Sequence, residues 1–149
     1  MSNTYFYLLI ALLAGAMMPT QAATNNKMAA FVDSPVLAAF VSFVVGTVAL
    51  LAYVILSGIP LVNLTGVKDA PMIAWVGGLL GAFFVAAAVT LVPRLGIAMT
   101  FSLIIAGQMI VTLVIDHFGL LGVPVKEVSV ARIGGILLIT GGVILIRRF

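Results

Sequence analysis

Two groups of uncharged polar residues interrupt long apolar stretches of the chain, and their types suit hydrogen bonding to a small solute. The first group is Gln21, Thr24 and Asn25, and the second is Gln108 and Thr112. On an α-helix, at about 100° per residue, the members of the first group project within about 100° of one another. Amides and hydroxyls supply donors and acceptors without charge. We therefore predict that these residues bind substrate, and we predict no catalytic residue and no metal ligand.

The second group lies near the middle of an apolar run. Gln108 is about two residues from the centre of residues 97–115, which places it within roughly 3 Å of the bilayer midplane. Thr112 and Asp116 follow on the same face of the helix. Two interpretations stay open, because amides at this depth either line a polar pocket or serve as hydrogen bonds between helices. The methionines and the proline at 17–19 would suit an adaptable pocket beside the first group.

The charged residues give weaker evidence for a functional site. Asp116-His117 is compatible with an acid–base pair or a proton relay, but its place at the end of an apolar run favours helix capping or contact with lipid headgroups. No acidic residue lies in the middle of any apolar run. Because cation exchangers hold their substrate on such a carboxylate, we expect a neutral or weakly anionic organic solute. No HExxH or GxSxG motif is present, so we expect neither an enzyme nor a cofactor.

Composition sets the class of protein that must position these residues. Of 149 residues, 64% are hydrophobic and 7% are charged, whereas soluble domains carry roughly 25% charged residues. This excludes a soluble enzyme and a disordered regulator, and a net charge of +3 is too small for a nucleic-acid-binding surface. The absence of cysteine excludes disulfides and thiolate metal sites. An all-α integral membrane protein remains.

Five segments are long and apolar enough to cross about 30 Å of hydrocarbon, which takes about 20 residues as a helix. We predict one transmembrane domain over residues 1–149, with spans at about 4–30, 35–57, 72–92, 97–115 and 128–147. Asp33-Ser34-Pro35 predicts the start of the second helix. Residues 116–124 predict the last loop. Arg132 falls one turn inside the fifth span, where its side chain can reach the headgroups.

The first span has an alternative interpretation. Residues 5–18, followed by Thr20-Gln21-Ala22-Ala23, have the outline of a signal peptide with a small-residue cleavage site. No Lys or Arg precedes Tyr5. Since signal peptides begin with a positively charged region, we favour a span that is retained.

The basic residues do not set an orientation in the membrane. With five spans the chain ends lie on opposite sides, and the side of the N-terminus holds Lys68, Lys126 and Arg132. The other side holds Lys27, Arg94, Arg147 and Arg148. The positive-inside rule needs a clear excess on one side. The balance predicts insertion in both orientations and an antiparallel homodimer, unless it merely reflects the small number of charges.

Short motifs spread along the chain together resemble one family. They occur in order at residues 15–25, 42–47, 77–83, 93–96, 106–108 and 116–119; examples are Pro93-Arg94-Leu95-Gly96 and Asp116-His117-Phe118-Gly119. Together they are similar to the YdcZ-like five-helix proteins of the bacterial inner membrane, a branch of the drug/metabolite transporter superfamily. The resemblance covers nearly the whole chain.

The resemblance implies half of a transporter. Larger members of the superfamily have ten helices arranged as two inverted repeats with a substrate cavity between them. A five-helix member would therefore pair in the bilayer as an antiparallel homodimer, or with a paralogous five-helix protein, and transport a small organic solute by alternating access. A structural or accessory membrane subunit without a cavity, and a channel, are the alternatives.

Overall fold

The computed structural model describes residues 2–148, in which five α-helices are joined by turns and short 3-10 segments. The helices are α1 (Ser2–Val32), α2 (Pro35–Leu56), α3 (Met72–Leu95), α4 (Ile97–Phe118) and α5 (Val130–Arg148). Each is long and apolar enough to span a membrane. This confirms the all-α class with five spans. The first and last residues of the predicted domain, 1 and 149, lie outside the described residues.

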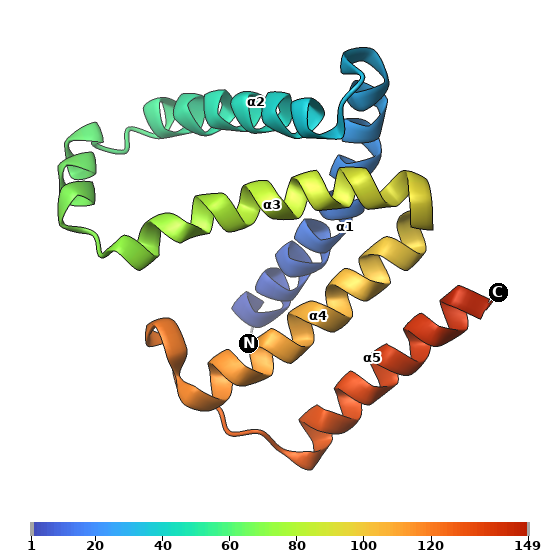
Figure 1. The fold of residues 1–149 in the computed structure, drawn as a ribbon. Coiled ribbons are helices and arrows are strands. Elements are labelled where there is room, and N and C mark those ends of the chain that lie inside the picture. The colour runs from blue at the N-terminus through green and yellow to red at the C-terminus, as the bar shows by residue number, and fades with distance from the viewer. Residues whose placement is uncertain (1, 149) are drawn as a thin grey trace. The chain divides into compact units, whose positions relative to one another are not determined.

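The chain divides into two compact units, Met1–Arg94 and Leu95–Phe149. The first contains α1, α2 and α3, and the second contains α4 and α5 (Figure 1). The single domain over residues 1–149 stays a prediction.

Helix α1 contains a proline in its interior, Pro19. Pro19 has no N–H group, so the carbonyl of Gly15 loses its helical donor. The next residue, Thr20, donates its hydroxyl to the carbonyl of Ala16 at 2.9 Å. Such a bond supplies an additional donor where the helical ladder is interrupted. The helix therefore continues through the proline to Val32.

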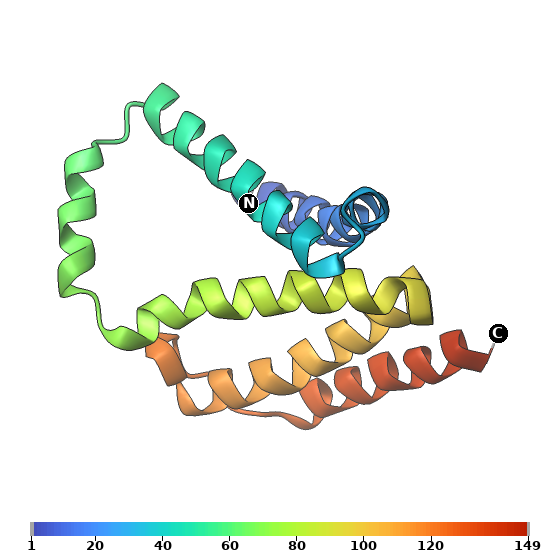
Figure 2. The same cartoon turned by 45° about the horizontal axis from the view of Figure 1, so that its top comes forward.

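A tight turn joins α1 to α2, and in both views α2 starts beside the end of α1 (Figures 1 and 2). Asp33 has a left-handed backbone with φ 51°. Ser34 is the N-cap of α2, where its hydroxyl oxygen accepts the N–H of Leu37 at 3.3 Å, and Pro35 opens the helix. The predicted N-cap is confirmed.

Small residues make the core of the first unit. Ala38 and Ala39 of α2 are buried against Val85 and Val89 of α3. Alanine lets helix backbones approach closely, which is how helices pack where lipid tails are as apolar as the side chains. The core therefore lies where the first half of α2 meets the second half of α3.

The second unit is a helical hairpin. Helices α4 and α5 run side by side in opposite directions (Figures 1 and 2). Helix α4 ends at Gly119, which has a left-handed backbone with φ 60°. Residues 120–122 form a short 3-10 turn. The N–H of Lys126 donates a hydrogen bond to the carbonyl of Asp116 at 2.8 Å. The loop is thus tied back to the end of α4.

Helices α4 and α5 and the loop between α2 and α3 differ from the sequence prediction. Helix α4 continues through Asp116 and His117, which the sequence places in the loop. The left-handed Gly119, and not the first polar residue, ends the helix. Helix α5 begins at Val130 because the Ser129 hydroxyl caps it, accepting the N–H of Arg132 at 3.3 Å. The loop between α2 and α3 contains a 3-10 helix, Leu61–Asp69.

We expect the Gly119→Ala variant to unfold at a lower temperature in detergent than the wild type. The residue has a left-handed φ, and a Cβ there would lie 2.7 Å from Cγ2 of Val125. Left-handed backbone costs a non-glycine residue about 1 to 2 kcal/mol, and the contact adds to this cost. Gly122→Ala is the matched control, because its φ is 81° but a Cβ would meet nothing within 4 Å. Equal destabilisation by both variants would show that the contact with Val125 is unimportant.

Candidate functional site

Two residues of the first predicted group line a narrow crevice between α1 and α3. Gln21 and Asn25 come from α1 and face Phe84 of α3. The other lining residues are apolar: Met18, Ala22, Val85 and Ala88. The crevice is too narrow to hold a water molecule. It therefore brings the buried Asn25 close to Gln21, which is itself exposed.

Asn25 has an unusual environment for an amide. The residue is 6% exposed, and its Nδ2 atom is buried without a hydrogen-bond partner among the described residues. An unpaired buried polar group costs about 1 to 3 kcal/mol. The adjacent Asn26 makes the contrast, because its Nδ2 donates to the carbonyl of Ala22 at 2.9 Å. The chain thus satisfies one of two neighbouring asparagines and leaves the other with an unused donor.

The other two residues of the first group have partners within the unit. Gln21 Nε2 donates to Ser42 Oγ of α2 at 3.4 Å, which is long for an N–H···O bond. Thr24 donates its hydroxyl to the carbonyl of Gln21 at 2.9 Å. Thr24 does not line the crevice, and its hydroxyl proton is used by its own helix.

In the second unit, Thr112 lines a groove of about 200 Å³ between α4 and α5. Asp116 and Arg132 lie along the same groove, together with Gly135 of α5. The Thr112 hydroxyl makes no hydrogen bond within residues 2–148, whereas the hydroxyl of Thr140 on α5 bonds back to its own helix at 2.9 Å. The predicted residue therefore offers an uncommitted hydroxyl to the groove.

Gln108 does not line this groove. It is exposed on α4, and its amide makes no hydrogen bond in the described part of the chain. The structure therefore assigns no contact to Gln108 within its own unit.

An ion pair holds the ends of α4 and α5 together. Arg132 Nη2 lies 2.7 Å from Asp116 Oδ2, and Arg132 Nη1 donates to the carbonyl of Lys126 at 3.0 Å. The side chains are 34% and 21% exposed, respectively, so the pair is only partly screened by solvent. Instead of capping its helix, Asp116 binds the guanidinium, and Arg132 has a protein partner in place of the predicted headgroup.

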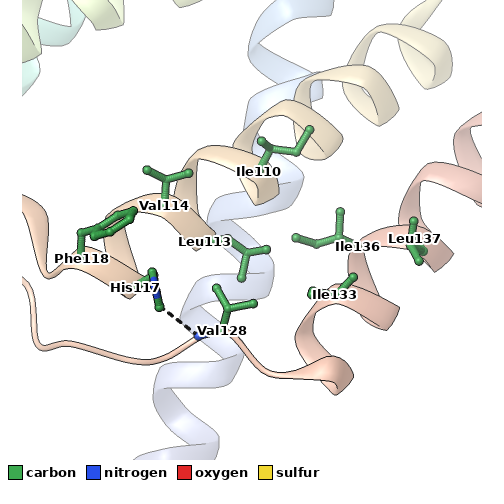
Figure 3. Close-up of a pocket in the computed structure, with 9 residues that line it drawn as sticks. All are labelled: Ile110, Leu113, Val114, His117, Phe118, Val128, Ile133, Ile136 and Leu137. Carbon is green, nitrogen blue, oxygen red and sulfur yellow. Dashed lines mark hydrogen bonds between the residues drawn. The ribbon is translucent and has the colours of Figure 1, made fainter.

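His117 belongs to a different, apolar groove. This groove has a volume of about 300 Å³ between α4 and α5, and His117 is the polar residue in its lining (Figure 3). His117 Nδ1 accepts the N–H of Val128 at 3.4 Å, and its ring packs edge-on against Phe118. No hydrogen bond between His117 and Asp116 is found within residues 2–148. The geometry gives no support to an acid–base pair.

Sequence reasoning missed the partner of Asp116. Two opposite charges at the facing ends of consecutive helices, joined by a short loop, are the signal that could have found the pair. Ser42 was also missed, because a single serine in an apolar helix carries no pattern. In the residues that the structure describes, no group of three or more potential ligand side chains is placed to hold a metal ion.

Comparison with known sequences decides the family. A family described as "Putative inner membrane exporter, YdcZ" matches residues 6–145. The chain belongs to this family. It is therefore a multi-pass protein of the inner membrane, as predicted from its motifs.

One curated relative in the YdcZ family is the Escherichia coli (strain K12) protein named "Inner membrane protein YdcZ", which is 38% identical over 71 residues. The aligned part spans 48% of this chain and 48% of the relative, so about half of that protein's length is matched. No solved structure matches the chain.

We expect Asp116→Asn and Arg132→Gln each to destabilise the α4–α5 hairpin by about 1 to 2 kcal/mol, because each leaves a partly buried charge unpaired. The double variant should cost less than the sum of the two single variants, since neither charge then remains. The measurement is thermal unfolding of the four proteins in detergent, with Glu127→Gln as a control for removing a carboxylate from the same loop. Strictly additive effects would contradict a coupled pair.

Proposed function

We propose that the protein transports a small organic solute across the inner membrane as an antiparallel dimer, by alternating access. The observation that carries the proposal is the set of uncommitted polar groups on spanning helices. Asn25, Gln108 and Thr112 make no hydrogen bond within the described residues, although residues that join helices as glue should be bonded. Groups left free in apolar helices are available to a solute.

The predicted substrate-binding residues keep this role in the proposal, some by direct contact with the solute and others by positioning a neighbour. Asn25 in the first unit, and Gln108 and Thr112 in the second unit, are each proposed as solute-contacting groups of their own unit. Gln21 would line the same crevice as Asn25. Thr24 would hold the backbone of Gln21 in place through the bond from its hydroxyl to the Gln21 carbonyl. The mid-span groups carry no acid, so a neutral or weakly anionic solute is the substrate class that fits them.

Three features support antiparallel pairing. Five spans put the chain ends on opposite sides, and the basic residues are nearly balanced between the sides. Ten-helix members of the superfamily have two inverted five-helix repeats, which a second copy would supply here. The paired glycines of α5 are also uncovered: a Cβ on Gly134, Gly135, Gly141 or Gly142 would meet nothing within 4 Å among the described residues. A face of this kind allows the close approach of another helix.

Alternating access needs helices that can bend, and α1 has such a point. Pro19 interrupts its hydrogen-bond ladder two residues before Gln21, the first residue of the predicted site. The family description adds a direction, export from the cytoplasm. In this proposal the dimer binds solute from the cytoplasmic side and rocks about the interface between the copies.

Two rival functions make different predictions. A structural subunit would move no solute in liposomes, and all of its polar groups would join helices. A channel would show uncoupled flux that persists at all times. Flux of purified protein that saturates with solute concentration supports the transporter.

We expect a reporter fused to the C-terminus to be found on both faces of the inner membrane, because the basic residues give no preferred orientation. The measurement compares a fusion that is active in the cytoplasm with one that is active outside it. Labelling on one face alone, in cells that express no partner, would contradict the homodimer. Adding three Lys or Arg to one side should lock the orientation and abolish flux by that variant alone.

We expect Gln108→Ala to weaken the apparent affinity for a transported solute about fivefold, the effect of losing one neutral hydrogen bond. The folded dimer should remain, since an interhelical bond in a membrane contributes only about 0.6 kcal/mol on average. The measurements are liposome flux and the dimer fraction in detergent. Thr140→Ala is the control, because the Thr140 hydroxyl bonds to its own helix. Loss of the dimer with unchanged flux per dimer would assign Gln108 to helix packing.

A further inference from the structure

The crevice between α1 and α3 offers one hydrogen-bond donor that is unused among the described residues and a second that is only weakly bonded. Nδ2 of Asn25 is buried and has no partner among the described residues. Nε2 of Gln21 reaches Ser42 Oγ at 3.4 Å, at the long end of the range for a hydrogen bond. Both nitrogens belong to residues that line the same crevice. An oxygen entering the crevice would meet two weakly satisfied donors.

The rest of the lining offers neither charge nor a competing polar side chain. Met18, Phe84 and Val85 are apolar, and the remaining lining residues are alanines. An ammonium group would find no carboxylate there. An acceptor group attached to an apolar body would instead match both the amides and the surrounding side chains.

We propose that the Asn25 amide selects the substrate by donating a hydrogen bond to a carbonyl or carboxylate oxygen. The inference rests on the proposed transport function, because a solute must enter the crevice, and it adds the group that is recognised and the residue that recognises it. An acceptor oxygen satisfies the unpaired donor, so binding removes a cost that the empty crevice bears.

The crevice as it stands is the closed form of this subsite. It has no room for water, so a solute enters only when α1 and α3 move apart. Pro19 lies on α1 shortly before Gln21 and leaves the Gly15 carbonyl without its helical donor. The segment that carries both amides can therefore move relative to the first half of α1.

The test exchanges donor for acceptor at nearly constant shape. The probes are benzamide, benzoate and benzylammonium, which share a ring and differ in the polar group. Asn25→Asp replaces the amide donor with a carboxylate. The matched control is Asn26→Asp, which adds the same charge one residue away, where the native amide already bonds to Ala22.

Binding is measured on the full-length protein in nanodiscs, by the side-chain NMR signals of ¹⁵N-labelled asparagine and by probe titration. For the wild type we expect saturable binding of benzamide and benzoate, with a shift of the Asn25 signal. In Asn25→Asp the affinity for benzoate should fall by about tenfold or more, and benzylammonium should become the preferred probe. Asn26→Asp should rank the probes as the wild type does.

Asn25→Leu covers the case in which a buried carboxylate prevents folding. Leucine has a similar size and no donor, so this variant should fold and bind benzamide about fivefold more weakly. Failure of the wild type to bind either acceptor probe, or the same ranking of probes in wild type and Asn25→Asp, would overturn the inference. Dissociation of the dimer in Asn25→Leu, with unchanged probe affinity, would also overturn it and assign Asn25 to the contact between copies.

Liposome flux of the same probes separates this inference from the proposed function. If the wild type transports the probes and the Asn25 variants transport them with the same preference, the protein is a transporter whose recognition group is not Asn25. Binding at Asn25 without flux by the wild type leaves a recognition site and contradicts transport of these probes.

Discussion

The absence of water from the hydrocarbon of a bilayer is the constraint on which this structure depends. Every polar group at that depth has to find a partner in the protein or bear the cost of having none. The backbone meets this requirement by forming helices. Threonines such as Thr47 and Thr90 meet it by donating their hydroxyls to carbonyls one turn earlier, at 2.8 and 2.7 Å. Arg132 meets it by binding Asp116.

Against this background the unsatisfied groups are the informative ones. Asn25 is buried beside Asn26, and the two residues have the same chemistry. Among the described residues, Nδ2 of Asn26 is bonded and Nδ2 of Asn25 has no partner. Thr112 and Thr140 show the same contrast in the second unit. A folded protein does not need these free donors for its own stability. They are the observation on which the proposed solute binding rests.

The two units differ in how tightly their helices are held. The α4–α5 hairpin is closed by an ion pair, a backbone bond from Lys126 to Asp116 and a glycine in a left-handed conformation. In the first unit, Ala29 and Val32 of α1 pack against the core of α2 and α3. The side-chain hydrogen bond from α1 to α2, from Gln21 to Ser42, is long, and α1 meets α3 along a crevice lined mostly by apolar side chains. Dispersion contacts between apolar surfaces are non-directional and can be remade after a small displacement. A displacement of α1 along this crevice therefore breaks fewer directional interactions than a displacement within the hairpin.

Composition and hydropathy by themselves determined the all-α class, the number of spans and the membrane location, because about 20 apolar residues have one stable arrangement across a bilayer. Local chemistry also predicted the cap at Ser34, and the amides of the first group were recognised as candidates from residue type and helical spacing. The sequence could not show that Asn25 is unsatisfied while Asn26 is bonded, or that Asp116 meets Arg132. Asn26 bonds to its own helix, but the burial of Asn25 beside α3 and the approach of Arg132 to Asp116 within about 3 Å depend on how one helix packs against another. Only the tertiary structure decides that packing.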